Sequence, residues 1–198
     1  MTFEALTALA LFAFVSSITP GPNNLMLMAS GANFGLLRTM PHMLGVAIGF
    51  VLMVVLVGVG VVRVFEIWPL SQTILNVACI LYLLYLAWKI ATAAPASPDA
   101  PETTGTPMTF LQAAAFQWVN PKAWAMAVSA TTVYLPRADL TGILLVGVIF
   151  GAINLPSVGV WAGLGVALRT FLSSPTRLRI FNWIMAILLV GSLWPIVA

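Results

Sequence analysis

Long apolar segments alternate with short polar ones along the whole chain. Between Glu4 and Arg38 lie 33 residues without a charge, and 29 such residues lie between Asp139 and Arg169. A helix rises about 1.5 Å per residue, so an apolar stretch of about 20 residues is long enough to cross the hydrocarbon of a bilayer. The pattern therefore predicts an integral membrane protein built from transmembrane helices.

Six of these segments have the length of a membrane span, and a short apolar piece, residues 25–32, follows the first of them. The spacing predicts an all-α integral membrane protein in which six transmembrane helices form one membrane domain. The predicted spans are residues 3–19, 41–62, 70–90, 110–134, 140–168 and 180–197.

One segment, residues 92–109, differs in composition from the rest of the chain. Prolines and a glycine alternate there with small polar residues, so a flexible surface loop is expected. The loop separates residues 1–91 from residues 110–198, with three predicted spans in each half. A unit of three spans ends on the opposite side of the membrane from its start. Two such units therefore have inverted topology, which is common in secondary transporters. A shift of 99 residues, which aligns Pro22 with Pro121, supports this repeat.

The composition agrees with a membrane protein. Of the 198 residues, 61% are hydrophobic and 7% are charged, and the mean hydropathy is +1.06. An average soluble domain has about 25% charged residues. The net charge of +3 comes from scattered basic residues that form no patch, so nucleic acid is not an expected partner.

The basic residues predict the orientation of the chain in the membrane. With six spans, most of them fall in loops on one face, and the positive-inside rule makes that face cytoplasmic. Both termini are then outside, and the expected location is the inner membrane of a bacterium. The first face carries Arg38, Lys89, Arg169, Arg177 and Arg179, and the other carries Arg63 and Arg137.

Helix breakers at membrane depth are the candidates for chemistry, and the first of them is Pro20-Gly21-Pro22-Asn23-Asn24. Proline stops a helix, and irregular backbone in a bilayer persists only where protein or a water-filled cavity satisfies it. The helix that restarts here would present free N–H groups and a positive dipole end to a carboxylate. An ordinary turn at the membrane interface is the alternative.

The fourth predicted span holds a counterpart, Gln117-Trp118-Val119-Asn120-Pro121-Lys122. Lys122 is the one charge that lies away from the ends of the predicted spans, and charges at this depth usually face a bundle interior or a cavity. This lysine could hold a substrate carboxylate or act as a titrating group. Alternatively, the span begins after Lys122, and the ammonium group lies at the interface.

Two further features concern helix shape and packing. Asn154 and Pro156 interrupt the fifth span and predict a broken or kinked helix that faces the bundle; a kink repaired by neighbouring helices is the alternative. Two small-residue pairs with GxxxG spacing predict close helix packing. These pairs are Gly45 with Gly49 and Gly147 with Gly151.

The remaining reactive residue types suggest no enzyme. No acidic residue lies deep in a predicted span, which argues against a carboxylate metal site or an acid–base pair. Cys79 lies in an apolar run and is expected to be a core residue. His42 follows Pro41 at the start of the second span and is expected to be solvated as part of a loop. We expect no metal, no cofactor and no enzymatic activity.

Several motifs together resemble the lysine-exporter family of amino-acid efflux proteins, also called the homoserine/threonine-resistance family. The Pro-Gly-Pro-Asn-Asn form and the stretch 154–157 are most similar to its cysteine and O-acetylserine branch. The motifs follow the family order along the whole chain: residues 17–24, then Gly31, Gly35, Gly45 and Gly49, then 78–89 and 116–122.

The resemblance implies export of small amino acids or their derivatives, driven by the proton gradient. It assigns importance to the residues 20–23 in the first half and to the residues 120–122 in the second. The chain departs from the family at one position, because several relatives have an acidic residue in the fifth span where this chain has Asn154. A carboxylate at that position therefore cannot carry the proton here.

The sequence thus predicts a secondary active exporter of a small zwitterion (cysteine or O-acetylserine, threonine or homoserine, or a lysine-like amino acid), with protons as coupling ion. A homodimer is one option for its assembly. A metal-ion or dicarboxylate transporter and a membrane enzyme acting on lipid head groups remain as alternatives. The residues expected to bind the substrate are Pro20, Gly21, Pro22, Asn23, Asn24, Gln117, Asn120, Pro121, Lys122 and Asn154.

Overall fold

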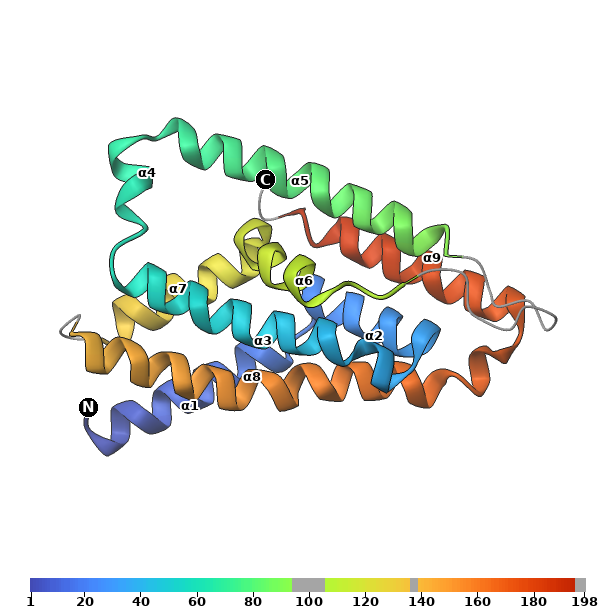
Figure 1. The fold of residues 1–198 in the computed structure, drawn as a ribbon, viewed down its shortest axis with the longest axis horizontal. Coiled ribbons are helices and arrows are strands. Elements are labelled where there is room, and N and C mark those ends of the chain that lie inside the picture. Colours follow the sequence, from blue (N-terminus) through green and yellow to red (C-terminus); the bar gives the residue numbers. More distant parts are fainter. Residues whose placement is uncertain (94–105, 136–138, 195–198) are drawn as a thin grey trace.

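The computed structural model describes residues 1–93, 106–135 and 139–194. All regular structure in these ranges is helical, and most of the longer helices run along the long axis of the molecule (Figure 1). Most of the predicted loop at 92–109 lies outside the described residues, as do Arg137 and the last residues of the sixth predicted span.

The helices follow the apolar segments of the sequence. Two short 3-10 turns, η1 (Gln117–Val119) and η2 (Phe171–Ser173), lie between them. The α-helices are α1 (Phe3–Ile18), α2 (Pro22–Phe34), α3 (Leu36–Gly58), α4 (Arg63–Ile67), α5 (Leu70–Ala91), α6 (Phe110–Phe116), α7 (Pro121–Val133), α8 (Leu140–Leu168) and α9 (Pro175–Gly191).

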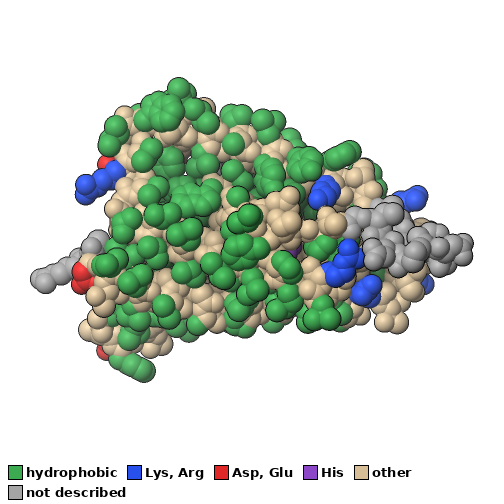
Figure 2. Space-filling model, viewed as in Figure 1, with side chains coloured by type: hydrophobic (Ala, Val, Ile, Leu, Met, Phe, Trp, Pro, Cys, Tyr) green, Lys and Arg blue, Asp and Glu red, His purple; other side chains and the backbone are tan. Residues whose placement is uncertain are grey.

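Membrane-spanning length is reached by three of the described helices. These are α3, α5 and α8, and the pair α1 and α2, which is bent by 53°, would be a fourth span if the pair crosses as one. Apolar side chains cover the face seen in Figure 2, and Lys and Arg lie toward its two ends. Exposed apolar groups such as Leu81 (63% exposed) and Val148 (66%) suit contact with lipid tails.

The fifth predicted span agrees with α8 in both bounds, but its shape differs from the expectation of a break. The helix continues through Pro156 without interruption. The broken-helix form of that prediction is therefore wrong. A proline in a helix removes one backbone donor, and the helix persists where its neighbours hold it in place; α8 packs against α1, α2 and α3.

The second predicted span begins earlier than expected. Helix α3 starts at Leu36, and Pro41 lies inside it rather than at its start. A glycine makes this earlier start possible, because Gly35, which joins α2 to α3, has a φ of +82°, a conformation that L side chains rarely adopt. His42 consequently lies within the helix and is 1% exposed, so the expectation of a solvated loop histidine is wrong.

Helices α2 and α8 cross with their backbones in contact at two glycines. A Cβ atom on Gly31 would collide with the carbonyl oxygen of Ala162, and one on Gly165 would collide with the carbonyl oxygen of Met28. The sequence motifs include Gly31 but not Gly165. Such small residues let helices approach closely in a membrane.

The two predicted GxxxG pairs lie at other helix contacts. A Cβ on Gly45 would lie 2.7 Å from the Cβ of Ala113, and one on Gly49 would lie 2.5 Å from the Cα of Ala114, both on α6. On α8, a Cβ on Gly151 would lie 2.9 Å from the Val51 side chain on α3. Position 147 faces the same residue at a looser 3.4 Å.

One end of the molecule, which we call the basic end, collects most of the basic residues. The start of α3, the ends of α5 and α8 and the start of α9 lie at this end, on the right in Figure 1. These helix termini carry the five residues predicted to face the cytoplasm: Arg38, Lys89, Arg169, Arg177 and Arg179.

Candidate functional site

The two interrupted helical segments, α1–α2 and α6–η1–α7, break near the centre of the molecule, where they meet (Figure 1). The first break comes at Pro20 and Gly21, and the second comes at Asn120. The Lys122 ammonium group donates a hydrogen bond to the Thr19 carbonyl oxygen at 2.6 Å, which joins one break to the other. Residues about a hundred positions apart therefore form a single site.

A small polar cavity, here called the central cavity, lies at this meeting point. Its volume is about 20 Å³, which is little more than the room for one water molecule. Of the residues predicted to bind substrate, only Pro20, Pro22 and Pro121 do not line it. The predicted residues that line it are Gly21, Asn23, Asn24, Gln117, Asn120, Lys122 and Asn154.

Several lining residues were not predicted. Ser16 and Ser17 lie one turn before the first break, and a pair of hydroxyls at the end of an apolar span is a signal that could have identified them. The apolar lining residues carry no comparable signal, because they cannot be told from ordinary core residues without the fold. They are Phe50, Ala123, Met126 and Val158.

The last carbonyl groups of α1 are bonded to side chains of three other helices. Asn24 of α2 donates to the carbonyl oxygens of Ser17 and Thr19, each at 2.8 Å. Trp161 of α8 donates to the Ile18 carbonyl oxygen at 3.0 Å. Lys122 of α7 donates to the Thr19 carbonyl oxygen. These groups have no partner inside the helix, so the end of α1 remains satisfied away from water.

Lys122 lies at the first break, partly exposed, with its ammonium group at the C-terminal end of α1. A second, longer contact of 3.4 Å reaches the Pro20 carbonyl oxygen. A cation at a helix C-terminus is favoured by the helix dipole. The side chain passes directly over Gly21, where a Cβ atom would lie 2.7 Å from the lysine Cδ. A larger residue at this position would therefore require the Lys122 side chain to shift.

A pair of side-chain amides links the two halves of the chain. Asn23 donates to Gln117 Oε1 at 2.8 Å, and Gln117 donates back to Asn23 Oδ1 at 3.3 Å. Gln117 is fully buried and also donates to the Ala113 carbonyl oxygen at 2.8 Å. The two breaks are thus held together by reciprocal hydrogen bonds beside the cavity.

The reciprocal amide pair predicts strong coupling between its members. Asn23→Leu leaves the buried Gln117 Oε1 atom without its partner, which costs about 1–3 kcal/mol, and Gln117→Leu removes both hydrogen bonds that the half-buried Asn23 amide makes with it. The double variant contains neither amide. We therefore expect its loss of unfolding free energy to be smaller than the sum of the two single losses by at least about 1 kcal/mol. Thermal unfolding of the four proteins in detergent measures this difference, and simple additivity would contradict the pairing.

Two groups that line the cavity are open to a ligand. Asn154 is 6% exposed and donates to Ser17 Oγ at 3.2 Å, but its Oδ1 atom has no hydrogen-bond partner in the part of the chain that the structure describes. The second is the N-terminus of α2, where Gly21 has no side chain to cap the first N–H groups. The start of α7 differs, because Asn120 caps it by accepting from the Lys122 backbone N–H at 3.1 Å.

The central cavity therefore combines cationic and donor groups with an unpaired acceptor. Lys122 and the start of α2 suit a carboxylate, and Asn154 Oδ1 suits an ammonium group. A metal ion would need a different set of ligands, and the described ranges contain no group of three or more His, Cys, Asp or Glu that could hold one. Cys79 is 3% exposed and lies in the apolar core, as expected.

Comparison with known proteins identifies a matching family and a similar protein. The family model described as LysE type translocator matches residues 14–192. The chain is also similar to a protein of Klebsiella pneumoniae subsp. pneumoniae that is named cysteine/O-acetylserine efflux protein. The two are 27% identical over 200 residues, which cover 96% of this chain and 95% of that protein. No solved structure matches the chain.

Proposed function

Because the chain belongs to the LysE type translocator family, and so is a membrane transporter of the amino-acid efflux type rather than an enzyme, we propose that it exports a small zwitterionic amino acid from the cytoplasm. The observation that carries this proposal is the central cavity. Its lining brings together the Lys122 ammonium group and the Asn154 Oδ1 atom, which has no hydrogen-bond partner among the described residues.

The substrate would bind through its two charged ends. Its carboxylate would accept hydrogen bonds from the free N–H groups at the start of α2 and from Lys122, and the α2 dipole favours a negative charge there. The substrate's ammonium group would donate to Asn154 Oδ1, which has no other partner. The buried side chains of Phe50 and Met126 would contact the rest of a small molecule.

A cavity of about 20 Å³ cannot hold an amino acid, so the conformation described here is a closed one. Binding would require the two breaks to separate on one side of the membrane at a time. The pair Asn23–Gln117 and the bond from Lys122 to Thr19 cross between the breaks, so these contacts would change during opening. Alternating access around a fixed site is the mechanism that this arrangement suggests.

The topology we propose has six spans in two inverted units of three helices, residues 1–91 and 110–198. The two broken segments support it, because α1–α2 and α6–α7 run in opposite directions through the centre of the molecule (Figure 1). With the basic end in the cytoplasm of a bacterium, the protein lies in the inner membrane with both termini outside.

For the substrate, we propose cysteine, O-acetylserine or an amino acid of similar size. The similarity to the Klebsiella protein supports this choice, because that protein is named for the efflux of these two compounds. Protons are the coupling ion in this proposal, and Lys122 is the one titratable side chain among the described residues that line the cavity.

The test is efflux from cells that express the protein. Cells are loaded with peptides containing cysteine, threonine or lysine, and the release of each free amino acid is followed with and without a protonophore. We expect cysteine release to rise with expression and to fall when the proton gradient is removed. If expression changes the release of none of the amino acids, the proposal is wrong.

The Asn154→Leu variant tests the site itself. It keeps a similar volume but removes the acceptor for the ammonium group, so we expect efflux per protein to fall about tenfold or more, equivalent to about 1.4 kcal/mol. The matched variant Asn154→Asp keeps an acceptor oxygen and is expected to retain more activity. Equal losses in both variants would indicate a steric role for Asn154 rather than recognition of the ammonium group.

A further inference from the structure

A second cavity, much larger than the first, lies at the basic end between α2, α3 and α5. Its volume is about 440 Å³, within the range of small-molecule sites. Lys89 and Trp88 near the end of α5 form part of its rim, where Trp88 is 63% exposed. We call it the basic-end cavity, and its deeper part is lined by Met26, Ser30, His42, Leu86 and Met108.

His42 is the unusual member of this lining. Its side chain is 1% exposed, yet neither Nδ1 nor Nε2 has a hydrogen-bond partner among the described residues. Ser30, the other buried polar side chain of the lining, pairs with Thr39 at 2.9 Å. A neutral imidazole offers one N–H donor and one nitrogen acceptor, and leaving both unpaired in a buried place is costly. This histidine therefore has bonding capacity that the described protein groups do not use.

One face of α2 connects the two cavities. Asn23, Met26, Ser30 and Asn33 are spaced three or four residues apart, so they lie on the same side of the helix. Asn23 lines the central cavity, and the other three line the basic-end cavity. A substrate that moves along this face would meet a polar side chain on almost every turn.

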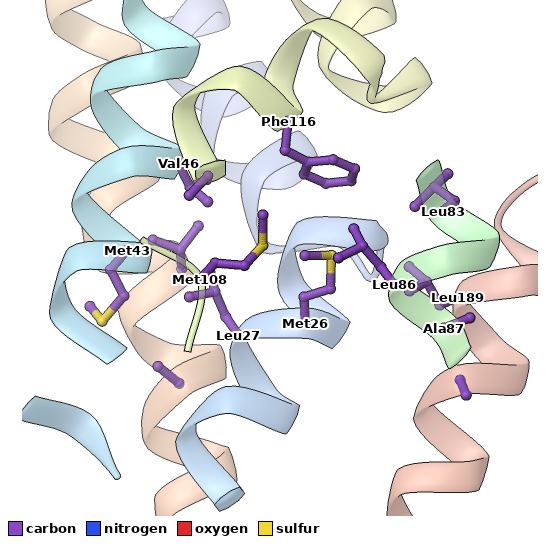
Figure 3. Packing of buried hydrophobic residues seen from close by; sticks show 14 of the residues in the cluster. Met26, Leu27, Met43, Val46, Leu83, Leu86, Ala87, Met108, Phe116 and Leu189 are labelled. Atoms are coloured by element: carbon purple, nitrogen blue, oxygen red, sulfur yellow. The ribbon is translucent and has the colours of Figure 1, made fainter. Parts of the chain in front are cut away.

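Flexible apolar side chains separate the cavities. Met26, Met108 and Phe116 lie close together in the core (Figure 3), and Phe116 directly precedes Gln117, which lines the central cavity. Methionine has three rotatable bonds and adapts its shape easily. A passage between the two cavities would require these side chains to change rotamer.

We propose that the basic-end cavity is a loading site, in which an amino acid binds before it reaches the central cavity. The inference rests on the proposed export function. In this site Lys89 attracts the carboxylate at the rim, and His42 forms hydrogen bonds with the amino group or a polar side chain deeper inside. Met26, Leu86 and Met108 contact the aliphatic part of the molecule.

Two substitutions of His42 test the loading site. His42→Leu removes both nitrogens at similar volume, and we expect it to raise the internal concentration that gives half-maximal efflux at least fivefold. It removes two unpaired buried polar atoms, so its unfolding temperature should be no lower than that of the wild type. His42→Gln keeps a donor and an acceptor and should restore half-saturation to within about twofold.

The outcomes separate this inference from the proposed function. If the wild type exports an amino acid and His42→Leu has the same half-saturating concentration, the loading site is wrong and the export function stands. If the wild type exports none of the amino acids, the proposed function fails, and the loading site fails with it.

A labelling experiment decides the case in which His42→Leu does not fold. A cysteine is introduced at Thr92, an exposed residue that lines the basic-end cavity, in a Cys79→Ala background. The ligand is O-acetylserine, because the thiol of cysteine would itself consume the reagent, and we expect O-acetylserine to slow alkylation at position 92 by a maleimide at least threefold in purified protein. A cysteine at Thr7, an exposed residue of α1 near the opposite end of the molecule, is the control and should not be protected. Equal rates at position 92 with and without the amino acid would overturn the inference.

Discussion

Lys122→Met is expected to reduce efflux per protein molecule by about tenfold to a hundredfold. The ammonium group is the cation that lines the central cavity, and its hydrogen bonds to the Thr19 and Pro20 carbonyl oxygens place it at the break of α1. A hydrogen bond to a charged group contributes about 1.5–3 kcal/mol, which corresponds to this range of rates. Efflux of the preferred amino acid, divided by the amount of protein in the membrane, gives the measurement.

Two further variants control this result. Lys122→Arg keeps the charge, but a guanidinium is wider and planar, and Gly21 leaves little room beside the lysine stem. We expect Arg to restore only part of the activity. Arg63→Met removes an exposed charge at the start of α4 and should behave as the wild type. Wild-type efflux by Lys122→Met would show that the cavity does not use this cation.

Gly165→Ala is expected to lower the stability of the folded protein by about 3 kcal/mol or more. The new Cβ atom would collide with the Met28 carbonyl oxygen and lie 2.8 Å from the Ala32 nitrogen. Both are backbone atoms, which cannot move aside as a side chain can, so α2 and α8 would have to separate. Overpacking costs typically about 1–3 kcal/mol even where side chains can yield. The unfolding temperature in detergent and the fraction of monodisperse protein measure the loss.

The same helix provides a matched control two residues away. A Cβ atom on Gly163 would meet no heavy atom of the described residues within 4 Å, apart from those of the glycine itself, its two chain neighbours and the adjacent backbone of its own helix. Gly163→Ala should therefore be neutral or stabilising by about 0.5–1 kcal/mol, because alanine is the better helix former. If the two alanine variants unfold at the same temperature, the α2–α8 contact is not as close as described.

The sequence predicted best those elements whose limits are marked by charges or caps. Helix α8 has the predicted bounds because Asp139 caps its first turn and Arg169 follows a run of residues without a charge. The start of α3 was missed, because Pro41 was interpreted as a boundary although a proline can lie inside a helix whose neighbours support it. The resemblance in the motifs is confirmed by the family match.

Within the site, the polar residue types near helix breakers were a good guide to the cavity lining. Their individual partners were not predictable, because they depend on which helices meet. Asn24 donates to two carbonyl oxygens of α1, and Trp161 reaches a third from a distant helix. The same reason explains His42, whose environment is set by α2 and α5 as well as by its own helix. Sequence spacing shows which residues share a face but not what that face touches.

The end of α1 also has a consequence for the order in which the protein is made. Its carbonyl groups are bonded by Asn24, Lys122 and Trp161, and the ribosome adds the last of these when most of the chain has already been synthesised. Until Trp161 has been added, the Ile18 carbonyl oxygen at the end of α1 lacks the hydrogen bond that it accepts in the folded protein. The N-terminal half therefore cannot complete its own structure during insertion, and it depends on the second half to do so.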